Sequence, residues 1–84
     1  MHYTYVLQSK DDHNRFYIGC TSNLRKRLAD HNGGLNQSTK GQLWRLVYYE
    51  AFLNLSAARK REYRLKMNRN TKRQLMKRVV DSLE

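Results

Sequence analysis

The fold of this chain is decided near its N-terminus, where residues 3–19 read YTYVLQSKDDHNRFYIG. Two short runs of apolar and aromatic residues, Tyr3 to Leu7 and Phe16 to Gly19, flank a polar stretch from Ser9 to Asn14. Runs of this composition on either side of turn-forming residues are typical of a β-hairpin. The pattern therefore predicts two antiparallel strands at the start of the chain.

A helix is predicted directly after the hairpin, from about Leu24 to Asn32. Three polar residues that can cap its N-terminus precede it, namely Thr21, Ser22 and Asn23. The pair Gly33-Gly34 ends it, because glycine is the usual residue after a helix. The polar composition of Leu35 to Gln42 predicts a mobile loop.

The C-terminal half predicts one strand and two helices. Trp44 to Phe52 is dense in β-forming residues. Ser56 can cap a second helix that reaches about Lys66, and Asn70 or Thr71 can cap a third. The predicted apolar face of the third helix comprises Leu75, Met76, Val79, Val80 and Leu83. We expect an α+β fold in the order β-β-α-β-α-α, with helices flanking a three-stranded antiparallel sheet.

Composition limits both the size of the protein and its partners. The chain has 84 residues, so we expect one domain over residues 1–84 with a single small core. It carries 17 Lys and Arg against 7 Asp and Glu, for a net charge of +10. A surplus of this size favours a polyanionic partner, most simply nucleic acid. The alternative is a basic but merely solvated surface.

One cysteine, Cys20, is present. It cannot form an internal disulfide, which fits a reducing compartment. The sequence has no apolar run long enough to span a bilayer and no signal-peptide pattern. We therefore expect a cytoplasmic protein.

An ordered set of residues resembles the GIY-YIG nuclease domain: Tyr3-Thr4-Tyr5, Tyr17-Ile18-Gly19, Arg27, His31 and Glu62. The resemblance covers nearly the whole chain and is strongest to the small stand-alone bacterial members. It implies hydrolysis of DNA phosphodiester bonds, and it implies that the motif tyrosines, here Tyr5 and Tyr17, line the site. Tyr3 stands where the family name has glycine.

Arg27 and His31 are expected to face the sheet. Counted at about 100° per residue, both fall on the side of their helix that carries its leucines. An arginine partly withdrawn from water needs a partner, and a phosphate fits its guanidinium group bidentately. Alternatively, the stem of Arg27 packs while its head stays in solvent. His31 matches a site residue of several family members, or it only favours the helix dipole.

Glu62 is the only acidic residue between Ala51 and Val80, and ten Lys and Arg surround it. By the same angular count it lies on the core-facing side of its helix. A carboxylate there suits one divalent cation, Mg²⁺ or Mn²⁺, beside a phosphate. The alternative is a structural ion pair, for example with Arg27.

Other positions have supporting roles in this interpretation. A cation and an arginine near a tyrosine favour its phenolate, so Tyr5 or Tyr17 could activate or position water. Gly19 is expected to allow a tight turn or a close approach of the substrate. The aromatic residues Tyr48, Tyr49 and Trp44 could stack on bases, although core and sheet packing is the expected role for at least half of them.

The basic second and third helices are expected to hold the DNA backbone. The predicted contacts are Arg64, Arg69, Lys72 and Arg73, with Lys40 added from the polar loop. Backbone contacts depend on salt and carry no sequence information. The resemblance implies an endonuclease-type, metal-dependent enzyme, and the backbone contacts add the expectation of weak sequence preference, with selection of single-stranded or branched DNA. The alternatives are a non-catalytic nucleic-acid-binding module and a domain that docks an acidic protein.

Overall fold

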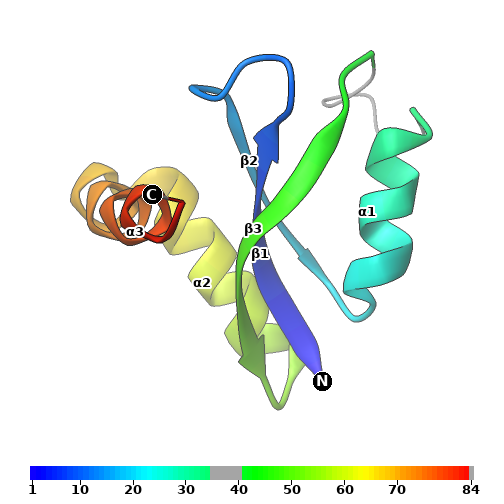
Figure 1. Cartoon of the computed structure of the whole chain (residues 1–84). Helices are drawn as coiled ribbons and strands as arrows, with labels where there is room; N and C mark the ends of the chain where they lie inside the picture. Colours follow the sequence, from blue (N-terminus) through cyan, green and yellow to red (C-terminus); the bar gives the residue numbers. More distant parts are fainter. Residues whose placement is uncertain (35–40, 84) are drawn as a thin grey trace.

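The computed structural model describes residues 1–34 and 41–83, and its elements follow the predicted order (Figure 1). They are β1 (His2–Ser9), β2 (Phe16–Thr21), α1 (Leu24–Asn32), β3 (Trp44–Phe52), α2 (Leu55–Met67) and α3 (Arg69–Ser82). The predicted α+β fold is thereby confirmed. None of the helices in the described part of the chain has the length and apolar composition that a bilayer crossing requires.

The three strands form one antiparallel sheet in the order β2-β1-β3. Tyr5 in the central strand lies opposite Gly19 of β2 and Tyr49 of β3, and Leu7 lies opposite Tyr17. Tyr5 and Tyr17 are therefore diagonal neighbours on one face. Because β2 is an edge strand, groups from both faces can meet along its outer side.

Helices cover both faces of the sheet, so the core consists of two clusters. Figure 1 shows α1 on one side and α2 with α3 on the other. Alternate residues of a strand point to opposite faces, and β1 follows this rule. Val6 faces α2 and α3, in a cluster with Ile18, Leu65, Leu75 and Val79. Tyr5 and Leu7 lie in the other cluster, with Trp44 and, from α1, Leu24 and Leu28.

An asparagine caps each helix at its N-terminus. The side-chain oxygens of Asn23, Asn54 and Asn68 accept hydrogen bonds from the backbone N–H three residues on. Asn23 was among the expected caps, whereas the predictions of Ser56 for α2 and of Asn70 or Thr71 for α3 were wrong. An asparagine precedes each of these predicted caps by two or three residues, and its short side chain reaches the free N–H groups of the first turn.

The apolar face of α3 is narrower than predicted. Leu75 and Val79 are buried and Met76 is partly buried, but Val80 and Leu83 are exposed. Val80 follows Val79 directly, so it points about 100° away from the packed side. Leu83 lies just beyond the last helical residue. The prediction that both contribute to the core was therefore wrong.

Candidate active site

A buried hydrogen bond joins the first motif tyrosine to the histidine of α1. The hydroxyl of Tyr5 lies 2.8 Å from Nε2 of His31. Tyr5 is 2% exposed and His31 is 0% exposed. Burial is the main cause that raises the pKa of Tyr5, and it also lowers the pKa of His31, with the charge of Arg27 as second cause. Both groups are therefore neutral near pH 7.

In this structure burial opposes the expected ionisation of Tyr5. The positive charge of Arg27 lowers its pKa, but burial and the nearby Tyr17 outweigh that effect. Burial dominates because it removes the water that would stabilise the phenolate. Tyr5 is thus a neutral partner for His31 in this structure and keeps its proton.

Gly19 leaves room for the ring of Tyr5. A Cβ atom at position 19 would overlap the Tyr5 hydroxyl and come within 2.9 Å of ring carbon Cε2. Gly19 lies inside β2, and the glycines with positive φ are Gly34 and Gly41. The expected tight turn is not found, because Gly19 lies within the strand; the need to accommodate the Tyr5 side chain explains the glycine.

Tyr17 is the more accessible of the two motif tyrosines. It is half-buried, and its ring centroid lies 4.9 Å from that of His31 and 6.5 Å from that of Tyr5. The ammonium group of Lys66 lies 5.7 Å from the centre of the Tyr17 ring. Tyr17 therefore joins the buried Tyr5–His31 pair to the charged residues of α2.

Glu62, on α2, joins this cluster through Lys66. One of its oxygens, Oε2, lies 2.8 Å from Nζ of Lys66, and 23% of its side chain is exposed. An ion pair of Glu62 therefore exists, but its partner is Lys66 one helical turn on, not Arg27. The negative charge of Glu62 raises the pKa of both Tyr5 and Cys20. The carboxylate of Glu62 is therefore within electrostatic range of both side chains.

Arg27 approaches from α1. It is half-buried and lines a small hollow of about 170 Å³ together with Lys26. Its charge acts on the pKa of Tyr5, His31 and Cys20. The pKa of Cys20 is raised first by burial and then by Glu62, while Arg59 and Arg27 oppose this. Cations from α1 and α2 and one carboxylate thus meet beside β2.

The donor set can be compared with the needs of a divalent cation. Within residues 1–34 and 41–83, no group of three or more His, Cys, Asp and Glu is suited to hold a metal ion. Mg²⁺ usually keeps several waters and takes one or two carboxylates plus substrate phosphates. The single carboxylate of Glu62 fits that mode of binding, provided that Lys66 releases it.

The predicted DNA-binding residues lie outside this cluster. Arg64, Arg69, Lys72 and Arg73 are all exposed. Arg64 lines a shallow hollow on α2, and the other three are on α3, which lies beyond α2 as seen from α1 in Figure 1. The remaining predicted contact, Lys40, is not among the described residues.

Sequence reasoning missed two residues that hold the site together. Lys66 pairs with Glu62, and the spacing of four residues between opposite charges is the signal that could have found it. Asn32 ties the end of α1 to β3. Its Oδ1 accepts a 2.7 Å hydrogen bond from the backbone N–H of Trp44, and its Nδ2 donates a 3.1 Å bond to the Trp44 carbonyl. No sequence pattern predicts the contact between Asn32 and Trp44.

The chain as a whole matches known proteins. The family described as the GIY-YIG catalytic domain matches residues 1–76. The chain belongs to the GIY-YIG family. This membership confirms the resemblance seen in the motifs and supports an endonuclease-type function for this GIY-YIG domain.

Similar GIY-YIG chains occur in several organisms. UPF0213 protein CPE1444 of Clostridium perfringens is 43% identical over 79 residues, which cover 90% of this chain and 83% of that one. UPF0213 protein SH2523 of Staphylococcus haemolyticus is 41% identical over 69 residues, covering 77% and 79%. The solution NMR structure of UPF0213 protein BH0048 from Bacillus halodurans matches with a TM-score of 0.54 and 34% identity, covering 90% of this chain and 82% of that one.

Proposed function

We propose that this protein is an endonuclease-type enzyme that hydrolyses DNA phosphodiester bonds with the help of one divalent cation. One observation carries the proposal: contacts join the motif residues into one cluster, in which Tyr5 lies 2.8 Å from His31, the Tyr17 ring packs against His31, and Lys66 lies over the Tyr17 ring and pairs with Glu62. The charge of Arg27 from α1 acts on Tyr5 and His31 in the same cluster. A phosphate placed there would face a guanidinium group, a carboxylate and the ring of Tyr17. We expect the enzyme to act in the cytoplasm, where a lone cysteine stays reduced.

Arg27 is proposed to bind the phosphate that is cleaved. In the reaction a water oxygen bonds to phosphorus and the bond to the 3′-oxygen breaks. Negative charge builds on the phosphate oxygens in the transition state, and a fixed guanidinium group stabilises it there. The half-buried position of Arg27 strengthens this effect, because less water screens the charge.

Glu62 is proposed to hold Mg²⁺ or Mn²⁺. When bound, the cation supplies positive charge to the phosphate and the departing oxygen. Lys66 neutralises Glu62 in the absence of substrate, at an N···O distance of 2.8 Å. When Lys66 gives up this carboxylate, its ammonium group stays beside Tyr17 and close to an incoming phosphate. The phosphate can then replace the carboxylate as the negatively charged partner of Lys66.

Tyr17 is proposed to orient the attacking water. Its ring rests on the buried Tyr5–His31 pair, whose hydrogen bond fixes both side chains. Tyr5 and His31 are then positioning residues, because burial keeps them from direct contact with a substrate in solvent.

The DNA itself is proposed to lie along the basic helices. The exposed cations Arg64, Arg69, Lys72 and Arg73 would contact backbone phosphates, and Lys40 would add to them. Such contacts do not read sequence, so selection would depend on the structure of the DNA, with single strands and branches preferred.

One observation favours the alternative of a non-catalytic nucleic-acid-binding module. The carboxylate that would hold the cation is already paired with Lys66. In that case the ion pair would persist when DNA binds, and the protein would bind DNA equally well with metal or with a chelator.

The test is incubation of the protein with labelled single-stranded, duplex and branched DNAs of matched length. Each DNA is incubated with Mg²⁺, with Mn²⁺ and with EDTA. We expect cleavage in either metal and none in EDTA, with single-stranded or branched DNA cleaved faster than duplex. Binding to DNA without cleavage in any metal would favour the alternative.

A further inference from the structure

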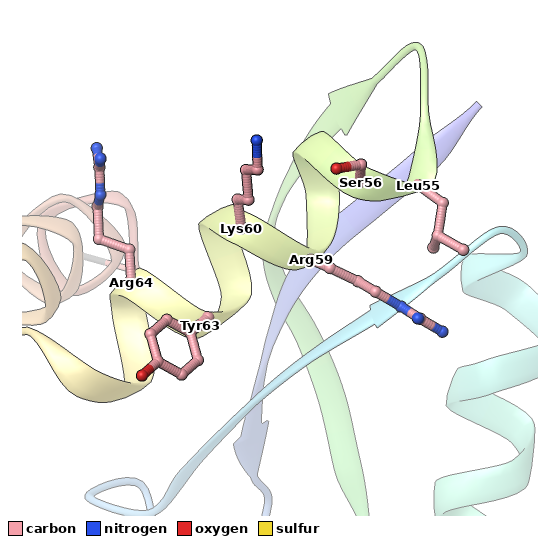
Figure 2. Close-up of a pocket in the computed structure, with 6 residues that line it drawn as sticks. All are labelled: Leu55, Ser56, Arg59, Lys60, Tyr63 and Arg64. Atoms are coloured by element: carbon pink, nitrogen blue, oxygen red, sulfur yellow. The ribbon is translucent and has the colours of Figure 1, made fainter.

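One face of α2 carries a shallow hollow of about 620 Å³ next to the candidate active site (Figure 2). Its lining residues are Leu55, Ser56, Arg59, Lys60, Tyr63 and Arg64. The ring of Tyr63 is the only aromatic group among them, and the residue is 66% exposed. Folding buries little of the surface of this tyrosine, so its ring is available to a partner.

The charge of the hollow defines the kind of partner. Three of the six lining residues are cations, and none is acidic. Within residues 1–34 and 41–83, neither Arg59, Lys60 nor Arg64 forms an ion pair with a carboxylate, whereas the neighbouring Arg61 is paired with Glu50. Unpaired cations around an exposed aromatic ring are complementary to a base with phosphates on either side.

The hollow and the active-site cluster both use side chains of α2. In Figure 2, Arg59 extends from α2 towards β2, and Tyr63 lies one helical turn further along. The charge of Arg59 lowers the pKa of Cys20, as Arg27 does, so Arg59 lies within electrostatic range of the cluster. Tyr63 directly follows Glu62 in the helix, so its side chain points about 100° away from that of Glu62, and Arg59 falls between the two around the helix axis. A strand whose phosphate lies at Glu62 therefore has to pass Arg59 before a base reaches the Tyr63 ring.

We propose that this hollow binds an unpaired nucleotide of the DNA strand, with Tyr63 stacked on its base and with Arg59, Lys60 and Arg64 contacting the adjacent phosphates. The inference rests on the proposed function, because the strand is the nuclease's own substrate. In duplex DNA the faces of the bases are covered by their neighbours and cannot reach Tyr63. Stacking on this ring is thus the source of selection for single strands.

The experiment measures binding in EDTA, where no cleavage occurs. A labelled oligothymidylate is compared with a strand of the same length in which every base is replaced by an abasic tetrahydrofuran unit. We expect the wild type to bind the thymidylate about tenfold more tightly, in line with stacking of one base. Tyr63→Ala should bind the thymidylate about tenfold more weakly than the wild type and bind the abasic strand unchanged. Tyr63→Trp should keep the preference.

Tyr49→Ala is the matched control. Tyr49 is 54% exposed on β3, and its ring packs edge-on against Tyr3 at 5.8 Å. We expect this variant to keep the full preference for bases. If Tyr63→Ala keeps the preference, or if Tyr49→Ala loses it, the inference is overturned.

The two proposals fail separately. Wild-type protein that cleaves DNA in Mg²⁺, paired with a Tyr63→Ala variant that still distinguishes the two strands, overturns the stacking role alone. Wild-type protein that cleaves nothing, paired with a Tyr63→Ala variant that has lost the base preference, overturns the nuclease and supports the stacking role.

Discussion

His31 is the most deeply buried of the candidate site residues, with 0% of its surface exposed. Burial, followed by the charge of Arg27, lowers its pKa in the folded state. In the unfolded chain it binds a proton below about pH 6.5. The unfolded state then holds more protons than the folded state. The free energy of unfolding must therefore fall as the pH drops below about 6.5.

We predict that the wild type is less stable towards denaturant at pH 5.5 than at pH 7.5, and that His31→Gln shows a smaller loss. The contribution of one histidine is at most about 1.4 kcal/mol per pH unit. His13→Gln is the control, since His13 is exposed and should leave the pH dependence unchanged. If the stability of the wild type and of His31→Gln depends on pH to the same extent, the buried His31 is not the cause of the loss at low pH.

Arg27 is predicted to act on the phosphate and not on the fold. Arg27→Ala should lower the single-turnover cleavage rate by a factor on the order of 10² or more, because a preorganised charge is lost. The thermal midpoint should change little, since the variant removes a half-buried charge. Arg25→Ala is the control, being exposed on the same helix. A destabilised Arg27→Ala variant with a normal rate per folded molecule would make Arg27 structural.

Part of the candidate site could be predicted from the sequence. The ordered motif predicted which residues to examine, and the helical period correctly placed Arg27 and His31 on the side facing the sheet. The protonation state of Tyr5 was not predictable, because it depends on burial by residues distant in sequence. The same is true of Gly19, whose role appears only when Tyr5 is placed opposite it.

The pairing of β1 with β2 depends on the absence of a side chain at position 19. We predict that Gly19→Ala destabilises the protein by about 1–3 kcal/mol, as other overpacked sites do, and slows cleavage by displacing Tyr5. The same change in a Tyr5→Val background should cost much less, because the overlapping ring is gone. Denaturant melts of the four proteins in this cycle measure the coupling. Additive costs would show that the overlap with Tyr5 is unimportant.

The helices and strands followed from local pattern, and the errors lie at their ends. Strand composition and helical period identified all six described elements. The caps of α2 and α3 were misplaced because Asn54 and Asn68 compete with nearby residues that can also cap. The exposure of Val80 depends on how α3 packs against α2, which local sequence does not contain.

For the whole molecule, the net charge of +10 is the property that would govern the proposed binding of DNA. We predict that Arg64→Ala, Arg69→Ala, Lys72→Ala and Arg73→Ala each weaken binding about equally across DNA sequences. Each true phosphate contact should reduce the slope of log affinity against log salt by roughly 0.7 to 0.9. Titrations at several salt concentrations measure this. If all four variants keep the wild-type slope, the DNA must bind away from α3 and away from the part of α2 that carries Arg64.

The central claim, that Glu62 supports metal-dependent cleavage, is tested most directly by single-turnover cleavage of single-stranded DNA in Mg²⁺ by Glu62→Gln. We predict a loss of about 10³-fold or more, because the bound cation contributes several kcal/mol, with DNA affinity unchanged or tighter. Lys66→Gln, which breaks the same ion pair but keeps the carboxylate, should lose less than about tenfold. Near-normal cleavage by Glu62→Gln, or an equal loss in both variants, would contradict the claim.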